Sequence, residues 1–232
     1  MIRRLIALAS VLVIISTVGC GSVDYADMEN YYRGAPRSVV VLPVRNESTE
    51  AEAGRFFLST VAKPLANRGY YVLPVEVTST IFAQEGILDE GLAWEVEPGR
   101  LAEYFGADAA LYVTIREWDT SYLVIASSVT VAIDYRLVDC RTGSTIWERH
   151  ARQTVSSRSH EAQPSLAGLV VVLVANAIDA AVTAAATDYV PLASKANYDA
   201  FGKLPPGIYH PRYSELQETI ATWRARQNAP GE

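Results

Sequence analysis

The amino-terminal leader determines where the fold of this chain can begin. Residues 1–4 carry two arginines, and the next segment, residues 5–18, has no charged side chain. About 14 apolar residues match the central part of an export signal, and they are fewer than the roughly 20 that a helix needs to cross a bilayer. We therefore expect residues 1–19 to be a removable signal and the folded part to follow it.

A motif of small residues ends the leader. Residues 17–20, Thr-Val-Gly-Cys, resemble the lipobox of bacterial lipoprotein signals, although leucine is usual where Thr17 stands. The resemblance implies cleavage before Cys20 and acylation of this residue, which would hold the chain at a membrane. Gly21 and Ser22 follow instead of the aspartate that usually retains such proteins in the inner membrane, so the resemblance implies the outer membrane. We expect the periplasmic face of this membrane, although the sequence leaves display at the cell surface open. The alternative is an ordinary secretory signal with an incidental cysteine.

The composition predicts a single domain without disulfides. About 213 residues remain after the signal, enough for one domain with its own core. We expect residues 20–36 to be a flexible tether, because they are polar and lack periodicity, and residues 37–232 to be the domain. Acylation of Cys20 leaves Cys140, interpreted as an ordinary turn residue, without a disulfide partner. The net charge of -6 and the lack of a cationic cluster disfavour nucleic-acid binding.

The first half of the domain alternates between strand and helix patterns. Residues 38–44 form an apolar β-branched run, residues 50–67 show helical spacing with Pro64 near the end, and residues 70–75 form a second strand. This order predicts a right-handed parallel unit. Further along we expect short helices at residues 78–84 and 100–105, with a loop at residues 91–99 between them. A strand is expected at residues 109–118.

The second half favours antiparallel strands. Strand-like runs at residues 122–125, 129–138 and 144–150 are joined by short turns, and Gly143 suits a positive φ in the second turn. A polar segment, residues 153–164, is expected to be a loop. The predicted fold class is therefore α/β with α+β character: a mixed sheet of about five to six strands, a parallel βαβ start, antiparallel carboxyl-terminal hairpins, and helices packed on the sheet.

The end of the chain combines an apolar helix with a tail rich in helix breakers. Residues 166–186 predict a buried helix against the sheet rather than a membrane span or a partner-binding helix, because Asn176 and Asp179 interrupt the apolar run. Residues 201–211 are expected to lie extended across the surface, and residues 214–226 to form a short helix. Tyr209, His210 and Tyr213 are candidate interface residues, because tyrosine buries area while keeping a polar end.

Catalytic signals are weak. The three histidines, His150, His160 and His210, form no ligand pair at helical spacing, and the adjacent pair His160 and Glu161 reads as a solvated loop. The sequence contains no glycine-rich phosphate loop, serine elbow or paired cysteine motif. The sequence therefore indicates neither an enzyme nor a bound cofactor or metal.

Five segments in order resemble one family of outer-membrane lipoproteins of unknown function, which includes a neisserial vaccine-candidate lipoprotein. They are VVVLPVRNES, TVAKPLANRGYYVLPV, GADAALYVTI, LVDCRTGSTIW and PPGIYHP. The resemblance implies a fold similar to the amino-terminal domain of the Tol translocation protein and to the periplasmic part of curli-secretion channel proteins. It implies no catalytic residues.

Two functions remain open at the level of sequence. The preferred hypothesis is a membrane-anchored, non-enzymatic module that binds or assembles protein partners of the cell envelope, with a curli-secretion-like lipoprotein as an implied partner. The alternative is an envelope hydrolase or a carrier of a small ligand or lipid, with a pocket between the sheet and the helix of residues 166–186. The sequence leaves the oligomeric state open.

Overall fold

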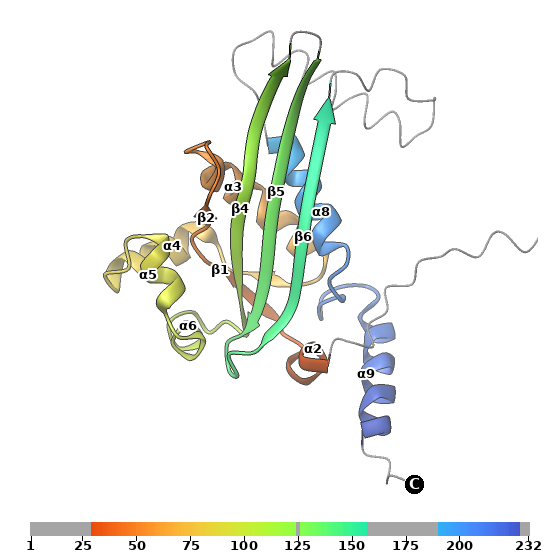
Figure 1. Cartoon of the computed structure of the whole chain (residues 1–232). Coiled ribbons are helices and arrows are strands. Elements are labelled where there is room, and N and C mark those ends of the chain that lie inside the picture. The colour runs from red at the N-terminus through yellow and green to blue at the C-terminus, as the bar shows by residue number, and fades with distance from the viewer. Residues whose placement is uncertain (1–28, 124–125, 157–189, 228–232) are drawn as a thin grey trace, which may run out of the picture.

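Six strands form one mixed sheet at the centre of the molecule. The computed structural model describes residues 29–123, 126–156 and 190–227, and elements are labelled as in Figure 1. The strand order is β3-β1-β4-β5-β6, and β2 pairs with β4 beyond the end of β1. β1, β2 and β3 are in parallel pairs, whereas β4, β5 and β6 are antiparallel to one another. The predicted fold class is therefore confirmed.

The parallel part of the sheet comes from the first half of the domain. Its elements are β1, Ser38–Val41; β2, Arg45–Asn46; α3, Ala53–Asn67; and β3, Tyr71–Val72. Pro43, which has no N–H to donate, separates β1 from β2. The predicted strand of residues 70–75 is shorter than expected, because Pro74 is the N-cap of the next helix. The expected helix of residues 50–67 is present and keeps Pro64 inside it.

Three long antiparallel strands form the rest of the sheet. They are β4, Ala109–Leu123; β5, Ala126–Asp139; and β6, Thr145–Ser156. Gly143 in the β5–β6 turn has φ 69°, the positive value for which glycine was expected. A bulge after Ile115 lets both Ile115 and Trp118 join the same apolar cluster. β4 and β6 are longer than the predicted strands, because their pairing with β5 continues through polar residues.

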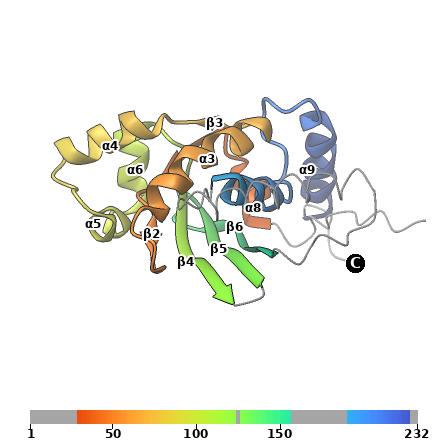
Figure 2. The ribbon, with the colours of Figure 1, turned by 90° about the horizontal axis from the view of Figure 1, so that it is seen from above.

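Two groups of helices cover different parts of the sheet. α3 and α8, Val190–Phe201, pack on the face of β4 and β5 that carries Val113 and Tyr135, which we call the helix face. The helices α4, Val75–Gln84; α5, Glu90–Glu95; and α6, Pro98–Phe105 bury Val40 and Ala110 on the opposite side, near β1. Further along β4, β5 and β6 that side carries charged residues, and none of the helices that the structure describes covers it (Figure 2). We call it the open face.

A buried polar chain links the helices to the sheet on the helix face. Asn197 of α8 is 0% exposed and donates to the Thr60 hydroxyl of α3 at 2.9 Å, while its amide oxygen accepts from the Tyr135 hydroxyl of β5 at 2.7 Å. Burial raises the pKa of Tyr135 well above its usual value, which keeps this hydroxyl a donor. Because a buried amide without partners is costly, these contacts fix α8 against both elements.

Two helices lie at the end of the sheet near the β5–β6 turn. α2, Glu29–Gly34, and α9, Tyr213–Gln227, are packed together through the rings of Tyr32 and Trp223, whose centroids are 5.7 Å apart. Tyr31 and Tyr32 are each 1% exposed. The prediction of a tether over residues 20–36 is therefore wrong for its last part, because these tyrosines are core residues and the described fold begins at Glu29.

Other differences concern short or weakly patterned segments. α5 lies partly within the predicted loop of residues 91–99, where Asp89 caps the helix by accepting from the Leu92 N–H at 2.8 Å. α8 was not predicted from the sequence. Pro191 is compatible with this helix, because it lies in the first turn, where a backbone N–H has no partner within the helix. The predicted helix at residues 214–226 is confirmed as α9. The predicted helix of residues 166–186, with the pocket expected beside it, lies outside the described residues.

Candidate functional site

The site residues expected from sequence fall in different environments. Cys20 lies outside the described residues. Tyr209 is 67% exposed, whereas Tyr213 packs against the main apolar cluster and His210 is half-buried. The three candidate interface residues of the tail therefore do not present one continuous aromatic surface.

The tail was expected to lie extended across the surface, but it is docked onto the turn after α3 and residues 204–207 are buried there. The Gly207 N–H donates to the Arg68 carbonyl at 2.8 Å, and the Tyr70 hydroxyl donates to the Pro205 carbonyl at 2.6 Å. Gly69 has φ 86°, and a Cβ built on it would lie 2.4 Å from the His210 nitrogen. The close approach of the two backbones therefore requires glycine, which the sequence pattern alone did not reveal.

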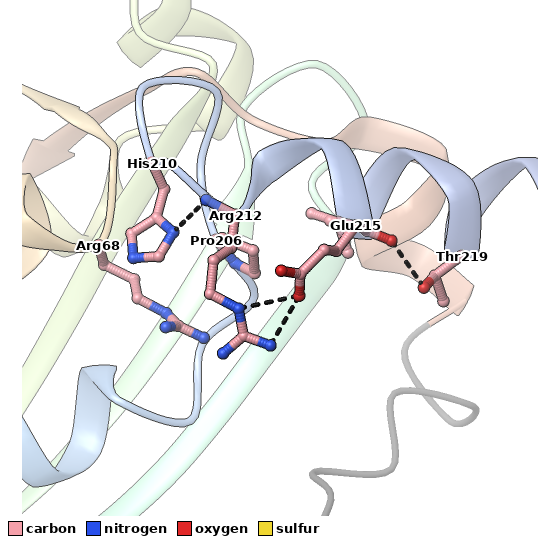
Figure 3. Close-up of a pocket in the computed structure, with 7 residues that line it drawn as sticks. Arg68, Pro206, His210, Arg212, Glu215 and Thr219 are labelled. Carbon is pink, nitrogen blue, oxygen red and sulfur yellow. Dashed lines mark hydrogen bonds and ion pairs between the residues drawn. The ribbon is translucent and has the colours of Figure 1, made fainter.

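A cavity of about 230 Å³ opens between this docked tail and α9 (Figure 3). Arg212 forms an ion pair with Glu215 at 2.7 Å, and the His210 Nδ1 accepts from the Arg212 N–H at 3.1 Å. Burial, together with the positive charges of Arg68 and Arg212, lowers the pKa of His210. The Thr219 hydroxyl, which also lines this cavity, donates to the Glu215 carbonyl at 3.0 Å and not to His210.

The open face is organised by charged side chains that pair across strands. Arg116 of β4 contacts the carboxylates of Glu47 and Asp134, and the latter also lies 2.7 Å from the His150 ring nitrogen. Burial opposes the ionisation of Asp134, but the hydrogen bonds from His150 and Arg116 outweigh it and lower the pKa of this carboxyl group. The cluster therefore carries an ionised aspartate at neutral pH.

Beside this cluster, two arginines lie over two aromatic rings. The Arg45 guanidinium carbon is 4.1 Å from the centroid of Trp94, and that of Arg136 is 4.6 Å from the centroid of Tyr112. The two rings meet edge to face at 5.2 Å. We call this arrangement the arginine–aromatic pocket; it lines a cavity of about 250 Å³ that also reaches Glu148.

Neighbouring elements fix the aromatic floor of this pocket. The Trp94 indole N–H donates to the Pro43 carbonyl at 2.9 Å, and Tyr112 is 4% exposed. Across the described chain, neither Arg45 nor Arg136 forms an ion pair with a carboxylate. Both guanidinium groups are therefore held by rings rather than neutralised, and their hydrogen-bond donors can be used by a bound molecule.

Sequence reasoning did not select the arginine–aromatic pocket. Its members come from β2, α5, β4 and β5, so no local motif contains them. The alternation of β5 does place Asp134 and Arg136 on one face, which is the only signal that pointed there.

Of the remaining candidates, Cys140 is a structural residue, and His160 and Glu161 lie outside the described residues. Cys140 is buried, and burial raises the pKa of its thiol to about 12, so it is a packed side chain rather than a reactive one. Within residues 29–123, 126–156 and 190–227, no three His, Cys, Asp or Glu side chains gather as metal ligands would. In the same part of the chain, every helix is too short or too polar to cross a bilayer.

Comparison with known proteins gives consistent relatives. A family model described as "Putative lipoprotein GNA1162-like" matches residues 23–207. A curated protein of Neisseria meningitidis serogroup B, "Putative lipoprotein NMB1124/NMB1162", is 35% identical over 152 residues, which cover 66% of this chain and 70% of the relative.

Solved structures include a member of the same group. The crystal structure of lipoprotein GNA1162 from Neisseria meningitidis has 36% sequence identity and a TM-score of 0.52, covering 62% of this chain and 99% of that one. A dodecamer of PelC from Paraburkholderia phytofirmans has 15% identity and a TM-score of 0.46, covering 74% of this chain and 88% of that one. The expected likeness to Tol and curli-secretion proteins stays a prediction.

Proposed function

Because this chain belongs to the GNA1162-like lipoprotein family, we propose that it is a lipid-anchored, non-enzymatic module that binds protein partners in the cell envelope. In this proposal the acylated Cys20 holds the domain at the periplasmic face of the outer membrane. The arginine–aromatic pocket on the open face is the partner site. A curli-secretion-like lipoprotein is the partner class that the sequence resemblance suggests.

The lipid anchor is supported by the leader and by the family. The uncharged segment of the leader leads into Cys20, and a family of lipoproteins matches from residue 23 onward, just after it. Gly21 and Ser22 support the outer membrane over the inner one.

The single observation that carries partner binding is the composition and rigidity of the arginine–aromatic pocket. Tryptophan, tyrosine and arginine are the residue types that contribute most to protein–protein binding energy, and they do so most when neighbouring contacts hold them in place. Trp94 and Tyr112 are fixed by a hydrogen bond and by burial, and each supports one arginine. Little side-chain entropy would be lost on binding, which favours affinity.

Site-specific crosslinking in cells tests the partner site. A photoreactive phenylalanine analogue at Glu148, on the rim of the pocket, is expected to form an adduct with an envelope protein. The same analogue at Lys63, exposed on α3, is the matched control and is expected to form no such adduct. Arg136→Ala should remove the adduct formed from position 148. An adduct of equal yield in the Arg136→Ala variant, or none from position 148, would contradict the proposed site.

The anchor has its own test. Mass spectrometry of the protein from its native host is expected to show cleavage before residue 20 and acyl chains on Cys20. Cys20→Ser should abolish both and release the protein from the outer-membrane fraction. An unmodified thiol in the native protein would overturn the anchor without bearing on the pocket.

A further inference from the structure

Three carboxylates line the arginine–aromatic pocket together with three arginines. Glu47 and Asp134 are engaged by Arg116, and Asp134 also contacts His150. The third carboxylate is Glu148, whose side chain forms no ion pair or hydrogen bond with any residue that the structure describes. Apart from His150, which is charged only when protonated, the formal charges that line the cavity cancel. The pocket therefore selects an occupant by its pattern of charges and not by a net charge.

The charged side chains of the pocket that have no ion-pair partner in the described chain lie in a row across the open face. Arg136 of β5 is directly opposite Tyr112 of β4 on one side and Glu148 of β6 on the other. Arg45 of β2 is opposite Thr114, on the far side of β4. The row crosses three strand spacings, or about 14 Å. Two guanidinium groups therefore come first, and one carboxylate lies at the far end.

The aromatic rings keep these charges available. Arg136 and Glu148 are cross-strand neighbours, a position in which long side chains can pair, but the Arg136 guanidinium lies over the Tyr112 ring instead. Arg45 lies over Trp94 in the same way. Burial raises the pKa of Tyr112, and the charge of Arg136 only partly opposes this rise, so the ring remains neutral. A bound molecule can therefore reach donors on two guanidinium groups and acceptors on Glu148.

The surroundings of the pocket are acidic on the Trp94 side. Residues 75–105, which include α4, α5 and α6, contain seven acidic residues and one basic residue, Arg100. Arg100 is paired with Glu103. This negative charge and Glu148 repel an occupant that is only anionic, whereas Arg45 and Arg136 repel one that is only cationic.

We propose, resting on the function proposed above, that the partner segment in this pocket carries an acidic and a basic side chain together. The acidic side chain binds between Arg45 and Arg136, and the basic one binds Glu148. Guanidinium groups held on rings present planar donors to a carboxylate, and the cation on Glu148 offsets the repulsion by the neighbouring carboxylates. In an extended segment, side chains two residues apart lie on one face about 7 Å apart, so a glutamate and a lysine at this spacing reach both parts of the row.

The length of the row favours a peptide over a lipid headgroup. An ethanolamine phospholipid also combines an anion with a cation, but only an ethylene unit and an oxygen separate its phosphorus from its ammonium group. The row from β2 to β6 is longer, about 14 Å, and lies along the surface of the sheet. Long side chains on an extended backbone match that length better.

Titration with short peptides tests the charge pattern. The probes are capped pentapeptides in which glycine alternates with glutamate and lysine, with glutamate and glutamine, or with glutamine and lysine. The mature lipidated protein, in nonionic detergent and with isotopically labelled arginine, reports binding through the side-chain N–H resonances of Arg45 and Arg136. The peptide with both charges should bind about tenfold more tightly than either peptide with one charge, because it alone forms both charged hydrogen-bonded contacts.

Matched variants should change the preference of the pocket. Glu148→Gln should let the glutamate–glutamine peptide bind as tightly as the peptide with both charges, whereas Glu218→Gln, exposed on α9, should keep the natural order. Arg136→Gln should weaken binding of both glutamate peptides about tenfold. Arg149→Gln is its control, because this exposed residue of β6 alternates away from the pocket. A changed preference requires a folded pocket, so misfolding does not imitate the result.

Several results would overturn the proposal. They are equal binding of the three peptides, binding of none, an unchanged order in Glu148→Gln, or tighter binding of glycerophosphoethanolamine, which would indicate a lipid headgroup. Crosslinking in cells from position 150, which leaves Glu148 in place, reports on the proposed function separately. An adduct with an envelope protein but no peptide preference contradicts the charge pattern alone. The expected preference without an adduct supports the charge pattern and contradicts the proposed function.

Discussion

The two faces of the β4–β5–β6 sheet are built from the same strands and use their residues in opposite ways. On the helix face Ile115 and Trp118 are buried in the apolar cluster, and the chain of Tyr135, Asn197 and Thr60 is joined by hydrogen bonds. On the open face the neighbouring residue Arg116 is exposed and holds two carboxylates. The comparison shows that burial is concentrated on one face of these strands, whereas the other face, to which we assign partner binding, is held by exposed charges.

Adjacent substitutions in β4 should separate the faces most clearly. Ile115→Ala is expected to lower the free energy of unfolding by about 3 kcal/mol, because a 0% exposed side chain leaves a cavity under α3. Arg116→Ala should leave the urea midpoint almost unchanged, because exposed ion pairs contribute little. Equilibrium urea denaturation of both variants measures the contrast, and similar losses would show that the open face also carries stability.

The buried polar chain should give the next largest effect. Asn197→Ala is expected to cost about 2 kcal/mol, because the Tyr135 and Thr60 hydroxyls then lose their shared partner. Tyr135→Phe removes only one hydroxyl and should cost less. In the double variant the losses should be smaller than the sum of the single losses. Additive losses in a double-mutant cycle would mean that the chain does not couple α8 to β5.

The docked tail continues the packed side of the molecule. Adding a single methyl group where the tail contacts the turn after α3 should lower the stability of the protein. Gly69→Ala is expected to cost about 1–3 kcal/mol, because its positive φ and its contact with the His210 backbone both exclude a Cβ. Gly99→Ala, in a helix with nothing near the new methyl group, is the matched control and should be neutral or slightly stabilising. Thermal unfolding of the two variants decides whether the tail is an integral part of the fold.

The smallest effect is expected on the open face and depends on pH. The folded-state pKa of Asp134 is lowered, so its contribution to stability is present above the unfolded value of about 3.9 and is lost as pH falls through the folded value. Asp134→Asn should therefore cost at most about 1 kcal/mol at pH 7, and the difference from the natural protein should vanish well below pH 4. A difference that grows as pH falls would reverse the sign and contradict the assigned hydrogen bonds.

Local patterns identified the elements whose side chains follow one period over many residues. The alternation through residues 129–138 and the turn at Gly143 predicted the β5–β6 hairpin, and the helical spacing before Pro64 predicted α3. The sequence patterns missed helices whose formation depends on a capping residue or on packing against distant elements. α5 depends on the Asp89 cap, and α8 depends on packing against α3 and β6.

The candidate site shows the same limit. Arg45 and Trp94 are 49 residues apart in the chain, and only the placement of α5 beside β2 brings the guanidinium onto the indole. In the tail, the sequence marked Tyr209, His210 and Tyr213 as candidate interface residues, but in the docked tail they lie in different surroundings.

By itself the sequence predicted the class of fold, the succession of the main strands along the chain and an anchor at Cys20, because these predictions rest on patterns among residues close together in the chain. The tertiary structure alone decided which arginines meet aromatic rings and which glycines allow two backbones to touch. Those features join segments distant in sequence, and their energies exist only after long-range packing has brought the segments together.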